Sequence, residues 1–376
     1  MVKKIVFTGG PSSGKTTVIE KVKQVYTSQG YKVLVVDETA TYLINMGIKP
    51  FGENPIKMID FQELVLKLQL AKEAIVERAV VMKDDENVLI IYDRGVIDNS
   101  AYVNEDEFKE VMTRLNYASS FAELMNRYDL VIDLVGRKDF YTLENNSARS
   151  EDVDKAMELG RTTLKSWMGH RKLKIVLPKD EMDEKINEVL NIINRLLEIK
   201  QVKRQEKYAV DLSKTDLKEI IKRGREMEIE QTYLESLPNV EKRLRKIRMN
   251  GSLSYLFSVY KIRDDGTKLC VSEKAISEKE YNAFLEFKDS RYDLIRKTRY
   301  YFDYLGQYFY LDIFSDKSDI GILEINVDES NKVVVPDFVS ILGRVTDDLA
   351  FYNKNIARKD GKELKKSDKN IYRPNA

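Results

Sequence analysis

The stretch Gly9-Gly10-Pro11-Ser12-Ser13-Gly14-Lys15-Thr16-Thr17 decides the fold of the first half of this 376-residue chain. A short apolar run at residues 4–8 precedes it. The segment after it carries apolar side chains at helical spacing, at Val18, Ile19, Val22 and Val25. The stretch therefore lies between a predicted strand and a predicted helix, and within it a glycine, four further residues, and then glycine, lysine and threonine follow one another.

This order of strand, glycine-rich loop and helix is the Walker A motif, which is typical of nucleoside triphosphate binding. The loop presents backbone N–H groups and a helix N-terminus to phosphate oxygens, and glycine at Gly9 and Gly14 permits its tight turn. We predict that residues 9–17 bind ATP or GTP, with Lys15 on the β- and γ-phosphates and the Thr16 hydroxyl on Mg²⁺. The motif alone does not decide among a kinase, a motor and a switch.

The rest of the first half alternates short apolar runs with helix-length segments, the pattern of a parallel sheet covered by helices. Strands are predicted at residues 4–8, 32–37, 88–92, 130–135 and 173–177, and helices at 55–83, 150–165 and 182–200. The sequence therefore predicts an α/β P-loop kinase-like domain over residues 1–199.

Charged residues follow two of these strands where each one ends. Asp93 and Arg94 follow the strand at 88–92, and Glu38 follows the strand at 32–37. Open parallel sheets bind ligands at the carboxyl ends of their strands. We predict that Asp93 supports the metal, that Glu38 takes a proton from an attacking hydroxyl, and that Arg94 stabilises the charge that develops. The alternative for each acidic residue is a helix N-cap.

A polar segment at residues 137–151 follows the fourth strand, where small kinases carry a lid. Arg149 within it is a predicted catalytic residue that closes on the transferring phosphoryl group, with Arg137 and Arg161 nearby in sequence. The alternative is a solvated loop with ordinary surface arginines.

The scarcest residues exclude several classes of chemistry. The chain has one cysteine, Cys270, and one histidine, His170, so it forms neither an internal disulfide nor a Cys/His zinc site. Oxygen ligands remain, and these favour magnesium or manganese. The 63 basic and 62 acidic residues give no net charge that indicates nucleic acid binding. No apolar run approaches the length of a membrane span or a signal peptide, so we predict a cytoplasmic protein.

The second half has apolar residues at period two, which predicts an antiparallel sheet or barrel over residues 200–350, with strands at 253–261, 308–314 and 321–327, and a polar tail at 351–376. Arg243 and Arg245 alternate on one predicted strand, Lys261 follows after a turn, and Lys297 and Arg299 repeat the arrangement. Basic pairs on one face of a sheet suggest a site lined for a polyphosphate. The alternative is an outward, solvated face.

Five motifs in the first half together resemble a known family. They are residues 9–17, Asp37-Glu-Thr-Ala, Asp93-Arg-Gly, residues 141–151 and Trp167-Met-Gly-His170. This combination resembles the AAA-type P-loop family related to the ribosylnicotinamide kinase domain of NadR, over roughly residues 1–180. The resemblance implies a kinase-like fold, ATP or GTP with magnesium, and phosphoryl transfer to a small hydroxyl acceptor. Trp167 and His170 match a family turn, which fits packing and a hydrogen bond at least as well as chemistry.

The second half resembles the CYTH, or triphosphate tunnel, family over about residues 202–330, on the segments 206–210, 229–234, 276–281, 297–301 and 311–314. The resemblance implies an eight-stranded antiparallel barrel that binds triphosphate-containing ligands with magnesium or manganese. The positions that match the family pattern are Lys207, Arg243, Arg245, Lys261, Lys297, Arg299, Asp312 and Glu324. Of these, Asp312 and Glu324 are the candidate metal ligands.

The chain departs from the CYTH pattern at the metal. Lys203, Gln205 and Asn326 stand where the family has carboxylates, so water activation by a metal in this half is hard to support. The two-domain order resembles the TRPL translocation defect protein family, which implies GTP and phosphoinositide binding.

The sequence therefore predicts an NTPase or phosphotransferase whose second domain binds a phosphorylated substrate or effector, such as a nucleotide or an RNA 5′ end. Two alternatives stay open. One is a regulatory protein that senses phosphorylated ligands with slow turnover, and the other is a tunnel triphosphatase with an appended ATPase.

Overall fold

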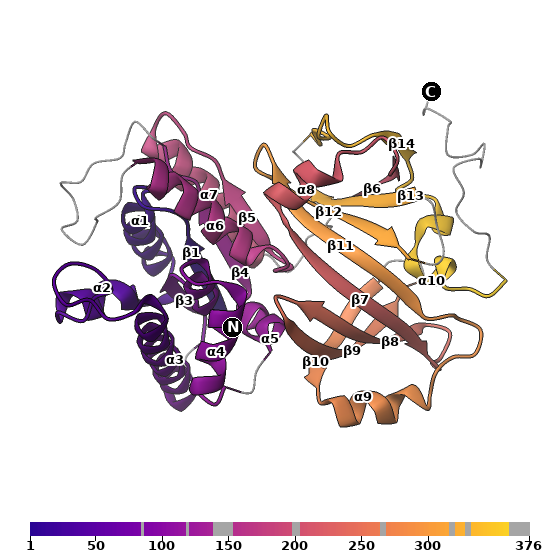
Figure 1. Ribbon diagram of the computed structural model, residues 1–376, viewed down its shortest axis with the longest axis horizontal. Helices are drawn as coiled ribbons and strands as arrows, with labels where there is room; N and C mark the ends of the chain where they lie inside the picture. The colour runs from indigo at the N-terminus through magenta and orange to yellow at the C-terminus, as the bar shows by residue number, and fades with distance from the viewer. Residues whose placement is uncertain are drawn as a thin grey trace. The chain divides into compact units, whose positions relative to one another are not determined.

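The computed structural model describes residues 1–83, 86–117, 120–137, 153–197, 204–263, 268–315, 320–327 and 332–360 (Figure 1). The chain divides into two compact units, one of Met1–Ser119 with Leu124–Gln201 and one of Val202–Ala376 with Ser120–Glu123. Within the described ranges, no helix has both the length and the apolar character needed to cross a membrane.

The first unit is built on a five-stranded sheet with the strand order β2-β3-β1-β4-β5, in which every neighbouring pair is parallel. All five strands lie where the sequence predicts them, because runs of Val, Ile and Leu buried on both faces give a clear signal. Its elements are β1 (Val2–Thr8), α1 (Lys15–Ser28), β2 (Lys32–Val36), α2 (Thr39–Asn45), α3 (Met58–Lys83), β3 (Val88–Asp93), η1 (Val96–Ala101), α4 (Glu105–Arg114), α5 (Phe121–Asn126), β4 (Leu130–Leu134), α6 (Val153–Trp167), β5 (Leu173–Val176) and α7 (Met182–Leu197).

Helices cover both faces of this sheet (Figure 1). The α1 and α7 helices pack against the odd-numbered positions of β1 and β3, such as Ile5 and Ile91. On the opposite face, Glu77 of α3 accepts hydrogen bonds from Lys4 and Tyr92. This layering leaves the carboxyl edge of the sheet as the place where loops from different strands meet.

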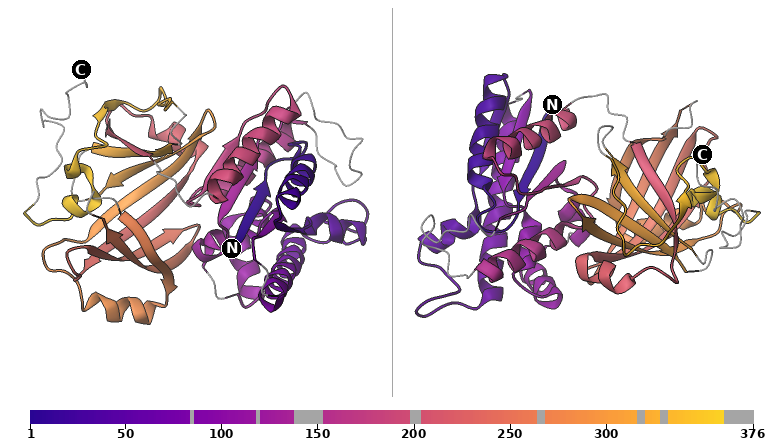
Figure 2. Two further views of the ribbon diagram at one scale, coloured as in Figure 1. Left: turned by 180° about the vertical axis from the view of Figure 1, so that it is seen from behind. Right: turned by 90° about the horizontal axis from the view of Figure 1, so that it is seen from above.

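The second unit is a nine-stranded sheet with the order β10-β9-β8-β7-β11-β12-β13-β6-β14, and its pairs are antiparallel. The sheet is strongly curved (Figure 2). Its elements are β6 (Arg204–Asp211), α8 (Leu217–Arg223), β7 (Arg225–Leu234), β8 (Val240–Met249), β9 (Ser252–Ile262), β10 (Lys268–Ile276), α9 (Glu278–Leu285), β11 (Ile295–Tyr304), β12 (Gln307–Phe314), β13 (Ile320–Val327), β14 (Ile341–Arg344), η3 (Leu349–Phe351) and α10 (Asn353–Ile356).

The antiparallel sheet is as predicted, but the closed eight-stranded barrel is not observed. Within the described residues β10 and β14 are the two edges of the sheet and do not pair with each other. Curvature alone brings distant strands toward one another without completing a ring of hydrogen bonds.

The two faces of this sheet differ in chemistry. On one face, apolar side chains such as Phe302 pack against α8, α9 and residues 333–341, and part of this face carries exposed charged residues such as Glu228 and Arg248. The other face carries buried charged residues, described below. Side chains alternate between the faces along each strand, so this difference follows from the period-two pattern of the sequence.

The expected polar tail begins later than predicted. Phe351, Ile356 and Ala357 are buried in a core cluster of the second unit, and α10 continues the chain against the charged face. These apolar side chains anchor residues 351–357, so this stretch belongs to the second unit. Residues 361–376 lie outside the described ranges.

Candidate nucleotide site and charged band

The loop between β1 and α1 has the backbone geometry that its glycines permit. Gly9 has φ of 130° and Gly14 has φ of 80°, both in the region that disfavours other residues. A Cβ atom at Gly9 would lie 2.2 Å from the carbonyl oxygen of Leu134, so the neighbouring strand also excludes a side chain there. Sequence and packing therefore fix the same loop conformation.

Lys15 is held inside this loop. Its Nζ donates to the carbonyl oxygens of Gly9 (3.1 Å) and Gly10 (3.3 Å) and to Oγ of Ser13 (3.4 Å). Burial and the nearby Arg94 lower the pKa of Lys15 to about 8, against the opposing influence of Asp93. Lys15 is therefore still a cation at neutral pH.

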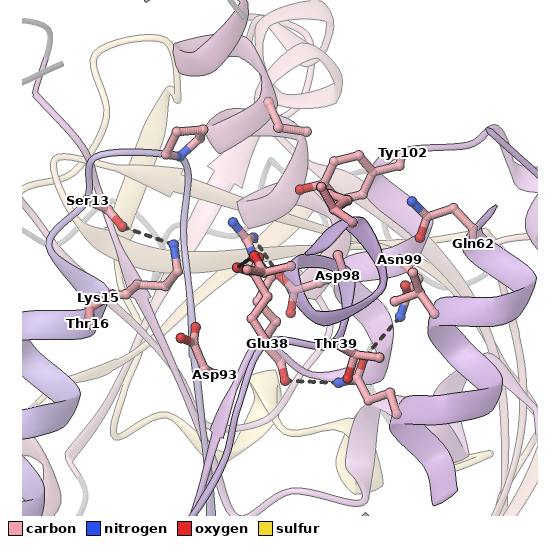
Figure 3. A pocket seen from close by; sticks show the side chains of 18 of the residues that line it. Ser13, Lys15, Thr16, Glu38, Thr39, Gln62, Asp93, Asp98, Asn99 and Tyr102 are labelled. Carbon is pink, nitrogen blue, oxygen red and sulfur yellow. Dashed lines mark hydrogen bonds and ion pairs between the residues drawn. The ribbon is translucent and has the colours of Figure 1, made fainter. Parts of the chain in front are cut away.

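A cavity of about 790 Å³ opens in front of the loop (Figure 3). This volume is typical of small-molecule sites. Loop residues 11–17 form one wall, including Thr16, and the ends of β2 and β3 form the floor with Glu38 and Asp93. The far wall is made by α2, α3 and η1 and mixes apolar with hydrogen-bonding side chains, namely Ile44, Phe61, Gln62, Asn99 and Tyr102.

Asp93 fits a magnesium ligand. Its Oδ1 is buried and has no hydrogen-bond partner among the described residues. Burial raises the pKa of Asp93 to about 6, with Glu38 adding to the effect and Lys15 and Arg94 opposing it. A buried carboxylate oxygen without a partner is costly unless a cation compensates it. Thr16 and Asp93 line the same cavity and would supply oxygen ligands to a magnesium ion carried by a triphosphate.

Charge in the cavity also favours a divalent cation. Among the described residues that line it, three carboxylates (Glu38, Asp93, Asp98) face two cations (Lys15, Arg94). A triphosphate would meet more negative than positive charge without a metal. Among the described residues, no group of three or more Asp, Glu, Cys or His side chains is arranged to hold a metal ion.

Glu38 and Arg94 form an ion pair at the cavity floor. The Nε atom of Arg94 lies 2.8 Å from Oε1 of Glu38, and the Thr41 hydroxyl donates to Oε2 at 2.7 Å. Burial raises the pKa of Glu38. Arg94, Lys15 and these hydrogen bonds lower that pKa by more than burial raises it, so the net shift is downward. Glu38 is therefore an ionised acceptor that can orient a hydroxyl group. The guanidinium of Arg94 stabilises the ionised carboxylate of Glu38 through this ion pair.

Asp98 is a site residue that the sequence analysis missed. Its carboxylate accepts from the Thr8 hydroxyl, Gly95 N (2.8 Å), Arg94 Nη1 (3.3 Å) and Trp167 Nε1 (3.2 Å). Arg94 has φ of 71°, an uncommon conformation for a residue with a side chain, and Asp98 contacts both its guanidinium and the backbone N of the next residue, Gly95. Neither the spacing of Asp98 in the sequence nor its neighbours signals this role, because Thr8 and Trp167 are distant along the chain.

The other residues that the sequence analysis singled out in the first unit are not among the described residues that line the cavity. His170 is fully buried, and its ring nitrogens contact the carbonyl oxygen of Tyr128 (3.1 Å) and the backbone N of Lys172 (3.1 Å). Burial lowers the pKa of His170 to about 4, so it is neutral and structural. The side chain of Arg161 is 73% exposed and pairs with Glu158. Arg149 and most of the predicted lid lie outside the described residues.

In the second unit, charged side chains form a continuous band across the inner face of the sheet. We define the charged band as the cations Lys207, Arg243, Arg245, Lys268, Lys297, Arg299 and Lys354 with the acids Glu241, Glu273, Asp312 and Glu324. The strand registers place neighbours opposite one another, such as Lys207 with Glu324 and Arg299 with Asp312. The cations of the band outnumber its acids.

The acids of the band are already occupied. Lys297 Nζ lies 2.5 Å from Oδ2 of Asp312, and Arg299 contacts both oxygens of the same carboxylate at 2.6 and 2.7 Å. Glu324 accepts from Lys207 at 2.9 Å and from Gln205 at 2.9 Å. Burial raises the pKa of Asp312, but Arg299 and Lys297 lower it more, and the net shift is downward. Asp312 and Glu324 therefore do not fit the predicted role of metal ligands.

Lys261 does not belong with the other predicted anion-binding residues. Arg243 pairs with Ser258 and Val240 pairs with Lys261, so Lys261 projects from the opposite face, where it is exposed. Two lysines that the sequence analysis did not select, Lys268 and Lys354, lie in the charged band. Lys268 Nζ lies 2.9 Å and Lys354 Nζ lies 3.6 Å from Oε2 of Glu241. Lys354 comes from α10, which periodicity along the strands could not indicate.

The parallel sheet, the phosphate loop and the position of Asp93 at the end of β3 together define a P-loop nucleotide-binding fold of the NTPase and kinase class. Comparison with known proteins agrees. Residues 4–185 match the model of a family described as "AAA domain". The prediction of an AAA-type P-loop domain is therefore confirmed for this part of the chain. The match ends at residue 185, and the resemblance of the second half to the CYTH family stays a prediction.

Solved structures that match include the PH1819 and PH1012 proteins from Pyrococcus horikoshii OT3 and a conserved hypothetical protein from Pyrococcus furiosus. The first has 18% identity, a TM-score of 0.27, and covers 34% of this chain and 80% of its own. The second has 18% identity and a TM-score of 0.27, covering 35% and 80%. The third has 17% identity and a TM-score of 0.27, covering 34% and 81%. No curated protein matches the chain.

Proposed function

We propose that the first unit is a magnesium-dependent phosphotransferase that moves the terminal phosphoryl group of ATP or GTP to a small hydroxyl acceptor. Asp93 carries this proposal, because it lines the same cavity as the phosphate loop and its buried Oδ1 has no hydrogen-bond partner in the part of the chain that the structure describes. Magnesium, when bound with the nucleotide, would neutralise phosphate charge. Lys15 and the loop N–H groups would hold the β- and γ-phosphates, and Thr16 and Asp93 would hold the metal.

The far wall of the cavity supports an acceptor rather than water alone. Gln62, Asn99 and Tyr102 offer hydrogen bonds, and Phe61 and Ile44 offer apolar contact. Such a wall binds a small molecule with both polar and apolar parts. Glu38, held ionised by Arg94, would accept a hydrogen bond from the attacking hydroxyl and orient it toward the phosphoryl group.

The charged band supports a second role for the second unit, the binding of a phosphorylated ligand. Its excess of cations favours an anion. The occupied carboxylates weigh against metal-dependent hydrolysis there, because Asp312 and Glu324 are engaged by cations and by Gln205. We therefore favour a phosphorylated effector or substrate, such as a nucleotide or an RNA 5′ end, over a tunnel triphosphatase.

Incubation with γ-labelled ATP or GTP, magnesium and a panel of acceptors tests the proposal. The panel contains nucleosides, ribosylnicotinamide and 5′-hydroxyl RNA, and Asp93→Asn is the control. We expect label on one acceptor class with the native protein and none with the control. Bound nucleotide without transfer or hydrolysis would overturn the proposal and favour a regulatory nucleotide sensor. Tripolyphosphate hydrolysis that survives Lys15→Ala but not Lys297→Ala would favour the triphosphatase.

A further inference from the structure

Lys185 on α7 is a buried cation that lies behind the phosphate loop and does not line the cavity. Its side chain is almost fully enclosed, with 6% of the residue exposed. Its Nζ donates to the carbonyl oxygen of Ser13 at 2.8 Å and to that of Val135 at 2.9 Å. One side chain thus joins the loop to the end of β4.

The contact with Ser13 has a geometric consequence. A trans peptide unit is planar, so its C=O and N–H groups point in opposite directions. The Ser13 carbonyl faces Lys185, and the N–H of Gly14 in the same peptide unit therefore points away from Lys185. Gly14 lines the cavity, whereas Lys185 does not. The hydrogen bond from Lys185 consequently fixes one loop N–H toward the place where a phosphate would bind.

Packing around the loop reinforces this arrangement. A Cβ atom at Gly136 would lie 3.2 Å from the carbonyl oxygen of Pro11, and one at Gly14 would lie 2.9 Å from Cε of Met182 on α7. The loop is therefore enclosed by β4 on one side and by α7 on the other. Lys185 of α7 makes polar contacts with both the loop, at Ser13, and the residue after β4, Val135.

We infer that Lys185 is a positioning residue for the phosphate loop, which orients the Ser13–Gly14 peptide and adds a positive charge behind it. This inference rests on the proposed binding of a nucleoside triphosphate. Burial lowers the pKa of Lys185 to about 8, while Asp133 and Glu188 oppose the shift. Lys185 is therefore protonated at neutral pH, and its field favours an anion at the loop.

The test compares native protein with Lys185→Met, which removes the charge and both donated hydrogen bonds. Calorimetry with magnesium would measure the affinity for the nucleoside triphosphate and, by competition, for the monophosphate, which lacks the β- and γ-phosphates. We expect triphosphate affinity to fall about tenfold, which corresponds to about 1.4 kcal/mol, and monophosphate affinity to change less than twofold. In turnover, KM should rise with kcat nearly unchanged, and Lys185→Arg should recover most of the affinity.

Lys179→Met is the matched control, because Lys179 is a nearby, half-exposed lysine paired with Glu188. It should bind both nucleotides as the native protein does. If Lys185→Met does not fold, Lys185→Gln keeps one donor without the charge and should still lose triphosphate affinity severalfold. Native affinity in the folded Met or Gln variant, or equal loss for both nucleotides, would overturn the inference. A native protein that binds no triphosphate would overturn the proposed function as well.

Discussion

The cavity of the first unit and the charged band of the second hold charge in opposite balance. Carboxylates outnumber cations around the cavity, and Asp93 keeps an oxygen without a hydrogen-bond partner among the described residues. In the band, cations outnumber carboxylates, and Asp312 and Glu324 are bound on both oxygens. Under the proposed function, the first arrangement would need a metal before it binds a polyphosphate, and the second would not. The difference in charge balance is what we expect for a phosphoryl-transfer site beside a site that only binds.

The largest expected effect comes from Lys15→Met. This change removes the cation that lies inside the phosphate loop, so nucleotide-dependent phosphoryl transfer or hydrolysis should fall by about 10²–10³-fold. Steady-state assays with labelled ATP and GTP would measure it. Tripolyphosphate binding by the second unit should persist in this variant, and its loss would contradict the separation of the two sites.

Removal of magnesium sharpens the contrast. In the native protein, EDTA should weaken triphosphate binding at the first unit by more than about tenfold, because the excess carboxylates are then left to repel the phosphates. In the Lys15→Met variant, tripolyphosphate bound at the charged band should be unaffected by EDTA. Calorimetry on both proteins measures this difference. A metal requirement at the band would show that its acids are available after all.

The two sites should also differ in their response to acid. Asp93 has a pKa of about 6, so protonation below that value removes a metal ligand, and magnesium–nucleotide affinity should fall by up to about tenfold per pH unit. Asp312 has its pKa shifted downward, so it remains ionised between pH 5 and 7 and its protonation contributes no acid limb at the band. Above pH 8 both sites weaken, because the pKa of Lys15 and that of Lys297 are about 8. Affinity measured against pH checks all three limbs.

Arg299→Met tests the band directly. It removes a guanidinium that contacts Asp312 with two hydrogen bonds, and Lys297 remains to compensate the acid. Tripolyphosphate affinity, measured in the Lys15→Met background, should fall about tenfold. Phosphoryl transfer by the first unit should be unchanged in the single Arg299→Met variant. This second measurement controls for a general loss of folding.

Lys261→Ala should have the smallest effect. Because Lys261 projects from the face opposite the charged band, tripolyphosphate affinity should stay within twofold of the native value. The same calorimetric titration measures it. A loss as large as that of Arg299→Met would show that the ligand reaches both faces of the sheet.

Much of the first site could be predicted from sequence, because its residues follow strand ends and a local loop motif. Asp93 and Glu38 line the cavity, and their positions after apolar runs predict that location. Asp98 could not be predicted in this way, because its role depends on Thr8 and Trp167, which come from other parts of the chain. Contacts between distant segments leave no periodic signal.

The wrong placement of Lys261 had a local cause. Asn250 and Gly251 both have positive φ, at 52° and 66°, and they form a two-residue turn that pairs Met249 with Ser252. Counting outward from that turn pairs Arg243 with Ser258 and leaves Lys261 on the other face. The Asn-Gly signal was present in the sequence, and it fixes the register that the spacing of basic residues alone did not.

Trp167 gives the nucleotide site an optical reporter. It is the single tryptophan of the chain and is fully buried, and its Nε1 donates to Asp98, which also contacts Arg94. All tryptophan fluorescence of this protein therefore comes from a side chain that is hydrogen-bonded to Asp98, a residue that lines the cavity. Intrinsic fluorescence of the unlabelled chain should follow the arrival of a ligand at Arg94 in real time.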